Sequence, residues 1–144
     1  MSRGFASAVA DQAACPCGSG ATLESCCGPL HQGLLKAQTA EQLMRSRYSA
    51  YALGEIDYLI VTHPELETPI HQRRRELRTS NRQIRWIQLE ILAVDSGGPE
   101  DCQGTVQFSA HYTAAGQRRC LEETSLFQRR DGQLGGDWLY IRAL

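Results

Sequence analysis

The sequence predicts an α+β fold in which an N-terminal metal-binding knuckle precedes helices that pack on an antiparallel sheet. Three observations support this: a cluster of cysteines in residues 15–27, helical spacing of apolar residues from residue 39, and alternation with period two from residue 85 onward. The chain has 144 residues, which is enough for one domain core and too short for two. We predict a tail and metal motif in residues 1–33 and an α+β domain in residues 34–144.

The stretch "CPCGSGATLESCC" contains four of the six cysteines, Cys15, Cys17, Cys26 and Cys27. A disulfide within either close pair would be strained, and one between the pairs would close only a short loop. Zinc accepts four thiolates in a tetrahedron, and such closed sites are structural. Free thiols and disulfides remain as alternatives, but we predict one structural Zn²⁺ per chain. Because four thiolates already fill a zinc shell, we expect His31 to be a surface residue rather than a ligand.

The first predicted helix covers residues 39–55, where apolar residues recur at helical spacing. Thr39 is a suitable N-cap, and Gln42 three residues later would complete a capping box. Gly54 suits the left-handed position that follows a helix.

Two shorter helices are expected next. The first covers residues 55–63 and must stop before Pro64, and the second covers residues 68–80, with Thr68 as its candidate cap. Between the motif and the helices, the stretch "GPLHQGLLKAQ" is interpreted as a turn-rich connector.

Four strands are predicted after the helices, in residues 85–94, 105–113, 119–130 and 138–144. Short turns separate them, which is typical of antiparallel hairpins. In the first strand we expect Ile87, Leu89 and Ile91 on one face and Trp86 on the other. Cys102 and Cys120 lie outside the cluster and are expected to be free thiols, with core filling as a simple role for Cys120 in the third strand.

Specific motifs carry a resemblance to known families. The stretch "CPCGSG" with the following "CCG" resembles the SEC-C zinc motif of the SecA translocation ATPase and of many small bacterial proteins. The stretches "LMRSRYSAY" and "DYLIVTH", the strand at Trp86, "E-x-S-x-F" from Glu123 and "W-x-Y" from Trp138 resemble the YchJ-like family of uncharacterised bacterial proteins. This resemblance implies a nuclear-transport-factor-2-like (NTF2-like) cone, that is, helices packed on a curved antiparallel sheet.

The resemblance also implies a role. In relatives with SEC-C motifs, the motif is associated with docking to another protein, such as a secretion chaperone or the ribosome. The lysines and the aromatic residue typical of the loop between the cysteine pairs are replaced here by "ATLE", residues 21–24. The basic surface of the family is therefore not expected in this chain, although the four ligands are.

A polar site is predicted inside the cone. Glu123 and Phe127 share a face of the third strand, so if Phe127 faces the helices, a buried carboxylate needs a donor. The first helix offers arginines, and we expect Glu123 to pair with Arg47. The pair either fixes the helix on the sheet or forms the base of a ligand pocket. The candidate pocket residues are Arg45, Arg47, Tyr48, Glu123 and Ser125.

No catalytic residue is predicted, because no His has a carboxylate partner at a recognisable spacing and no nucleophile elbow or phosphate loop occurs. The expected function is a zinc-binding protein that serves as a protein-interaction or scaffold module. The alternative is an enzyme or small-ligand-binding protein that uses Glu123, Arg47 and Tyr48.

Net charge and hydropathy limit the partners and the cellular location that we expect for the protein. The net charge of −1 does not predict a nucleic-acid-binding protein. In the segment 71–85, Arg74, Arg78 and Arg82 would share one helix face. Such a row suits RNA, the ribosome or an acidic protein surface, but a solvated face is the preferred interpretation. The opening residues contain no continuous apolar segment and no run is long enough to span a bilayer, so we expect a cytoplasmic protein without membrane contact.

Overall fold

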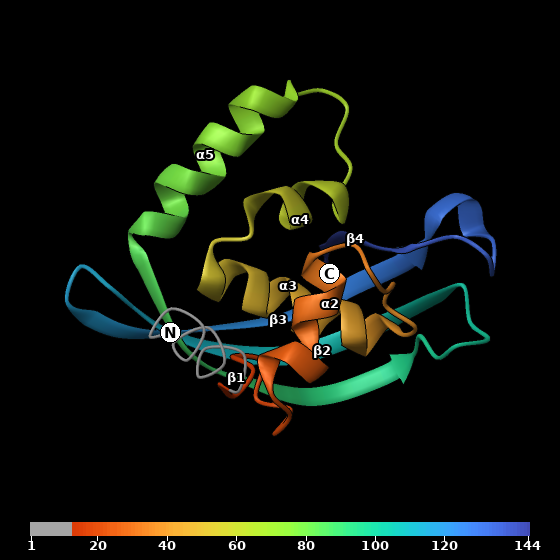
Figure 1. Cartoon of the computed structure of the whole chain (residues 1–144), viewed down its shortest axis with the longest axis horizontal. Coiled ribbons are helices and arrows are strands. Elements are labelled where there is room, and N and C mark those ends of the chain that lie inside the picture. Colours follow the sequence, from red (N-terminus) through yellow and green to blue (C-terminus); the bar gives the residue numbers. More distant parts are fainter. Residues whose placement is uncertain (1–12) are drawn as a thin grey trace, which may run out of the picture.

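Residues 13–144 are described by a computed structural model (Figure 1). The tail, on which the expectation of no secretory signal rests, lies outside these residues. Within residues 13–144, each helix is too short or too polar to span a bilayer. The elements are η1 (Leu23–Ser25), α2 (Cys27–His31), α3 (Ala40–Leu53), α4 (Ile56–Val61), α5 (Ile70–Arg82), β1 (Ile84–Ser96), β2 (Gln103–Ala114), β3 (Gln117–Arg129), η2 (Arg130–Gly132) and β4 (Trp138–Ala143).

The four strands form one antiparallel sheet in the order β1-β2-β3-β4. Figure 1 shows α3 and α4 lying over one face of the curved sheet, with α5 farther out. The core fills the space between α3 and the sheet, and its most buried side chains include Leu43, Val106, Phe127 and Trp138. The predicted α+β fold, with helices first and a meander after them, is confirmed.

Helix α3 has the predicted ends. The Thr39 side chain accepts a hydrogen bond from the Gln42 N–H at 3.0 Å, and Gly54 has φ +78°. The second half of the expected capping box is shifted by one residue. The Gln42 side chain accepts from the N–H of Gln38, at 2.6 Å, instead of from Thr39.

Two local predictions are wrong. Part of the predicted connector is helical, because α2 begins at Cys27, inside the metal motif. Thr68 does not cap α5, since Pro69 occupies the N-cap position and no side chain bonds the first turn. The backbone N–H of Thr68 is instead held by the Glu65 carboxylate at 2.9 Å.

The alternation expected in β1 is broken by a β-bulge between Trp86 and Gln88. The extra residue puts Trp86 and Leu89 on the same face, where both pack against the core. Ile87, predicted to be inside, is 43% exposed. A second irregularity follows Ile91, so the strict period of two fails twice in this strand.

In β3 the predicted inner face is confirmed at its far end, where Ser125 and Phe127 are buried. Near the turn, Cys120 is exposed, so the expectation that it fills core space is wrong. The helices cover only the half of β3 that approaches β4.

Replacing Thr39 with Ala should lower the free energy of unfolding by about 1 kcal/mol, because the Gln42 N–H loses its acceptor. Urea denaturation followed by circular dichroism measures this loss. Thr68→Ala is the matched control and should change stability by less than about 0.5 kcal/mol, since Thr68 caps nothing. Equal losses in the two variants would contradict the assignment.

Gly97 marks the tightest contact between helix and hairpin. It has φ +80°, and a Cβ there would lie 2.6 Å from the Ala40 Cβ. Gly97→Ala should therefore cost about 3 kcal/mol, the sum of left-handed strain and overpacking. Gly116→Ala, at φ +75° with nothing within 4 Å of the added Cβ, should show only the strain, about 1 kcal/mol. Two similar midpoints in urea would disprove the contact.

Candidate metal centre

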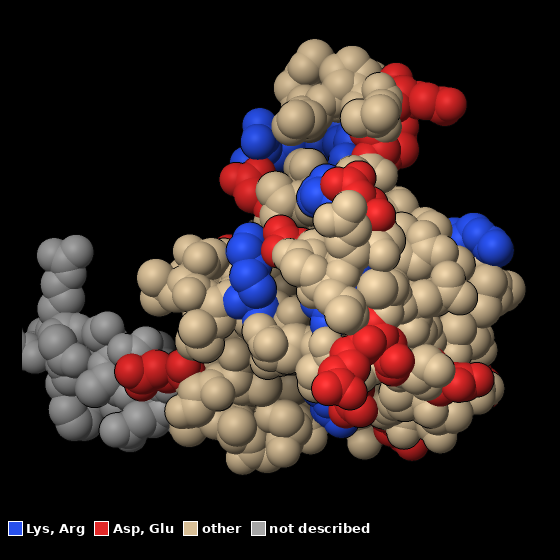
Figure 2. Space-filling model, turned by 90° about the vertical axis from the view of Figure 1, so that its right-hand side faces the viewer, with Lys and Arg blue, Asp and Glu red and all other residues tan. Residues whose placement is uncertain are grey.

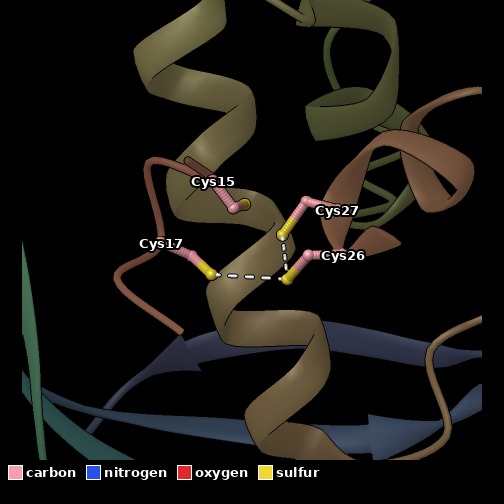
Figure 3. A group of neighbouring side chains, drawn as sticks. All are labelled: Cys15, Cys17, Cys26 and Cys27. Atoms are coloured by element: carbon pink, nitrogen blue, oxygen red, sulfur yellow. Dashed lines mark hydrogen bonds between the residues drawn. The ribbon is translucent and has the colours of Figure 1, made fainter. Parts of the chain in front are cut away.

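The four cysteines of the motif converge on one point. Their sulfur atoms all lie within 4.8 Å of one another. The Cys17 and Cys26 Sγ atoms are 3.7 Å apart, and those of Cys26 and Cys27 are 3.8 Å apart (Figure 3). In a regular tetrahedron with Zn–S bonds near 2.3 Å, sulfur atoms are about 3.8 Å apart. The spacing of the thiols therefore fits a tetrahedral metal ion.

Backbone geometry brings the two cysteine pairs together. Gly18 and Gly20 have φ +79° and +89°, which turns the chain sharply after the first pair. The Cys15 N–H then donates to the Ala21 carbonyl at 2.9 Å and closes this loop. At the second pair, Cys26 has non-helical backbone angles while α2 begins at the next residue. This break lets two adjacent side chains aim at the same point.

The cluster is enclosed by protein. Cys15, Cys17 and Cys27 are buried, and Cys26 is partly exposed and lies 3.3 Å from the Ser19 hydroxyl. Hydrogen bonds from Cys15 and Cys27 lower the pKa of the Cys17 thiol well below its ordinary value. Hydrogen bonding to Cys17 raises the pKa of Cys15, and hydrogen bonding to Cys15 and Cys17 raises that of Cys27. A divalent cation that binds here displaces the remaining protons from sulfur.

Arg45 belongs to this centre and not to the cone. Its Nη1 donates to the Cys17 carbonyl at 2.8 Å, and its Nε donates to Glu41 at 2.9 Å. Four thiolates around a divalent ion carry a net charge of about −2, which a neighbouring guanidinium stabilises. The prediction of Arg45 as a pocket residue is wrong, because two residues along a helix, as between Arg45 and Arg47, point to opposite sides.

His31 joins the motif to the α+β domain. A carbonyl oxygen only accepts, so His31 Nε2–H donates to the Ser46 carbonyl, at 2.8 Å. The imidazole also packs edge-on against Tyr58, with 5.0 Å between ring centroids. His31 is half-buried and not the surface residue we expected. The domain boundary placed at residue 33 stays a prediction.

The predicted ion pair between Glu123 and Arg47 does not form. Arg47 Nη1 donates to the Leu59 carbonyl at 2.9 Å and to the Thr62 hydroxyl at 2.6 Å, at the end of α4. Glu123 accepts instead from the Ser125 and Tyr140 hydroxyls. Each charge therefore has a nearer neutral partner, which the sequence pattern did not indicate.

Four of the candidate residues still line one pocket between α3 and the sheet: Arg47, Tyr48, Glu123 and Ser125. The sequence reasoning missed Trp86, Tyr51 and Tyr140, which also line it. The "W-x-Y" motif contained the signal for Tyr140, since Trp138 is buried in the core and its second neighbour shares that face. Trp86 was missed because the bulge turns it inward.

The arginines of α5 are divided between partners. Arg73 donates to the His63 carbonyl, and Arg74 bonds Asp57 at 2.9 Å. The predicted row on one helix face is thereby reduced to Arg78 and Arg82. On the face drawn in Figure 2, acidic and basic side chains are interspersed without a continuous basic area. The solvated helix face therefore stays the preferred interpretation, with RNA binding as its untested alternative.

Two family models match the chain in succession. The SEC-C motif matches residues 13–29, and the YchJ middle NTF2-like domain matches residues 39–143. The second match covers the helices and the whole sheet, so it accounts for most of the described fold. Together they confirm the predicted NTF2-like cone with an SEC-C motif ahead of it.

Relatives and solved structures agree. A UPF0225 protein of Geobacter sulfurreducens is 44% identical over 119 residues, covering 81% of this chain and 72% of its own length. A UPF0225 protein of Chromobacterium violaceum is 41% identical over 135 residues, covering 92% of this chain and 93% of its own.

The solution structure of a SEC-C motif-containing protein from Rhodopseudomonas palustris is 31% identical, with a TM-score of 0.73 over 90% of this chain and 96% of that one. The crystal structure of a SEC-C motif-containing protein from Psychrobacter arcticus, 23% identical, shares the fold with a TM-score of 0.74 over 93% and 83% of the two chains. The chain therefore belongs to the YchJ-like family, whose curated members are UPF0225 proteins.

Proposed function

We propose that the chain holds one structural Zn²⁺ at Cys15, Cys17, Cys26 and Cys27, and that the folded motif docks another protein. The observation that carries the proposal is the mutual spacing of the four sulfur atoms, all within 4.8 Å of one another. Such a site converts a short, glycine-containing segment into a rigid surface, because metal binding contributes directly to the folding free energy.

The donor set favours zinc in a structural role. All four ligands are thiolates, which select soft or borderline metals over magnesium or calcium. Four protein ligands also close the coordination shell, so no position is left for water or substrate. When bound, the ion crosslinks the loop at Cys15 and Cys17 to the start of α2 at Cys27.

Apolar exposure next to the motif supports a protein partner. Leu34 and Leu35 are separated from the end of α2 by two residues and are 71% and 61% exposed. Val61, at the end of α4 and 61% exposed, lines the same surface groove as Leu35. Residues 13–35 contain no Lys or Arg, which disfavours contact with nucleic-acid phosphates. An apolar protein segment fits this surface better.

Metal analysis tests the zinc site. Protein purified without added metal should contain about one zinc per chain by elemental mass spectrometry, and Cys26→Ser/Cys27→Ser should contain almost none. Cys102→Ser/Cys120→Ser is the matched control and should retain the metal, because neither thiol belongs to the cluster. Iron in place of zinc, or equal loss of metal from both double variants, would refute the proposal.

The docking surface is tested by affinity capture with quantitative mass spectrometry. Leu34→Ser/Leu35→Ser should keep its zinc and lose the proteins that the wild-type chain retains, because the apolar contact is removed. Leu66→Ser, at a side chain 99% exposed, is the control and should retain them. If the double variant and the control capture the same proteins, the surface at Leu34 and Leu35 is not the docking site.

A further inference from the structure

The pocket between α3 and the sheet is independent of the metal centre. Its volume is about 230 Å³, and its lining combines aromatic rings with two opposite charges. The chemistry of these groups restricts what the pocket accepts. Arg47 and Glu123 provide the charged groups that can contact a ligand. The rings of Tyr48, Trp86 and Tyr140 form walls that limit its shape.

Arg47 lines the pocket and keeps hydrogen-bond donors without a partner in the described residues. The residue is only 7% exposed, and burial lowers the pKa of its guanidinium from the ordinary value. Only Nη1 has hydrogen-bond partners among residues 13–144, namely Leu59 and Thr62. The donors on Nε and Nη2 have none there. A buried guanidinium with free donors stabilises an acceptor placed beside it.

Glu123 offers an acceptor in the same pocket. Both of its hydrogen bonds, from Ser125 and Tyr140, reach the same oxygen, Oε2. Within the described part of the chain, Oε1 accepts nothing. These hydroxyls fix the carboxylate through one oxygen, so its other oxygen is available to an N–H donor.

Tyr140 keeps the two charges apart. The Arg47 guanidinium lies 5.0 Å from the centre of the Tyr140 ring, while the Tyr140 hydroxyl donates to Glu123 at 3.3 Å. The two charged groups thus contact different parts of Tyr140, the ring and the hydroxyl, and do not form an ion pair with each other. The result is a pocket with zero net charge from this pair that contains both a donor and an acceptor.

Aromatic rings form the rest of the wall. Trp86 contacts Tyr48 and Tyr51, with ring centroids 5.7 and 5.8 Å apart. Burial raises the pKa of Tyr48 to about 12, so its hydroxyl stays protonated at neutral pH. Such walls favour a flat ring over a flexible aliphatic chain.

We propose that this pocket binds a planar, uncharged heteroaromatic lactam, with a ring N–H donating to Glu123 and a carbonyl oxygen accepting from Arg47. A cation would match Glu123 but face the arginine, and an anion would match Arg47 but face the carboxylate. A zwitterion would match both groups but would lose the hydration of two full charges on entering the pocket, so the pair favours a neutral ring with a donor and an acceptor.

Isothermal titration calorimetry of the full chain tests this with quinazolinone, a flat bicyclic lactam. Quinoline has the same shape without the N–H and the carbonyl, and it should bind about tenfold more weakly or worse. Glu123→Gln should weaken quinazolinone binding by about tenfold, because the charged acceptor is lost. Glu122→Gln is the matched control, since Glu122 is exposed, and should bind as the wild type does.

A second variant separates binding from folding. Leu121 lines the pocket and is 40% exposed, so Leu121→Trp should fill the pocket without altering its polar groups. This variant should keep the wild-type melting temperature and lose quinazolinone binding. The proposal is overturned if the wild type does not bind quinazolinone, if quinoline, benzoate or trimethylphenylammonium binds as tightly, or if Leu121→Trp still binds it.

Discussion

Helix α3 is packed on several sides at once, and most of the structure depends on this constraint. Successive residues of a helix are rotated by about 100°, so side chains adjacent in sequence contact different parts of the structure. Arg45 reaches the backbone of the metal motif, Arg47 reaches the end of α4, and Tyr48 enters the core against the sheet. The carbonyl of Ser46 receives His31 from α2. Helix α3 thereby fixes the positions of the metal motif, α4 and the pocket relative to one another.

The cysteine cluster and the pocket differ in how many of their polar groups already have partners within the protein. At the metal motif, four thiols point at each other and leave no free ligand position, which is the arrangement of a structural ion. In the pocket, Arg47 and Glu123 each use only part of their hydrogen-bonding capacity within residues 13–144. Polar groups that are fully paired stabilise a fold, whereas unpaired donors and acceptors in a cavity are available to a ligand. This difference distinguishes a closed cysteine cluster from a cavity with unused hydrogen-bonding groups in one small protein.

The β1 strand shows how a single extra residue changes the outcome. A regular strand would place Ile87 inside and Trp86 outside, as the alternation predicts. The bulge reverses the two, and Trp86 becomes a wall of the pocket that touches Tyr48 and Tyr51. An aromatic side chain in a small cavity is favoured over an aliphatic one because it fills more of the space between α3 and the sheet. The bulge also increases the local bend of the strand, which contributes to the curved sheet.

The sequence by itself determined the features that depend on neighbours along the chain. The ligand spacing at Cys15–Cys27, the caps of α3 at Thr39 and Gly54, and the order of helices and strands all follow from local periodicity and backbone preference. Tertiary structure alone decided which partner each long polar side chain takes. Arg47 bonds Leu59 and Thr62 rather than Glu123, and this choice depends on where α4 comes to lie. Arg45 likewise meets Cys17, which is 28 residues away in the chain, only because the motif folds back onto α3. Such contacts depend on distances across the fold, which one-dimensional patterns do not carry.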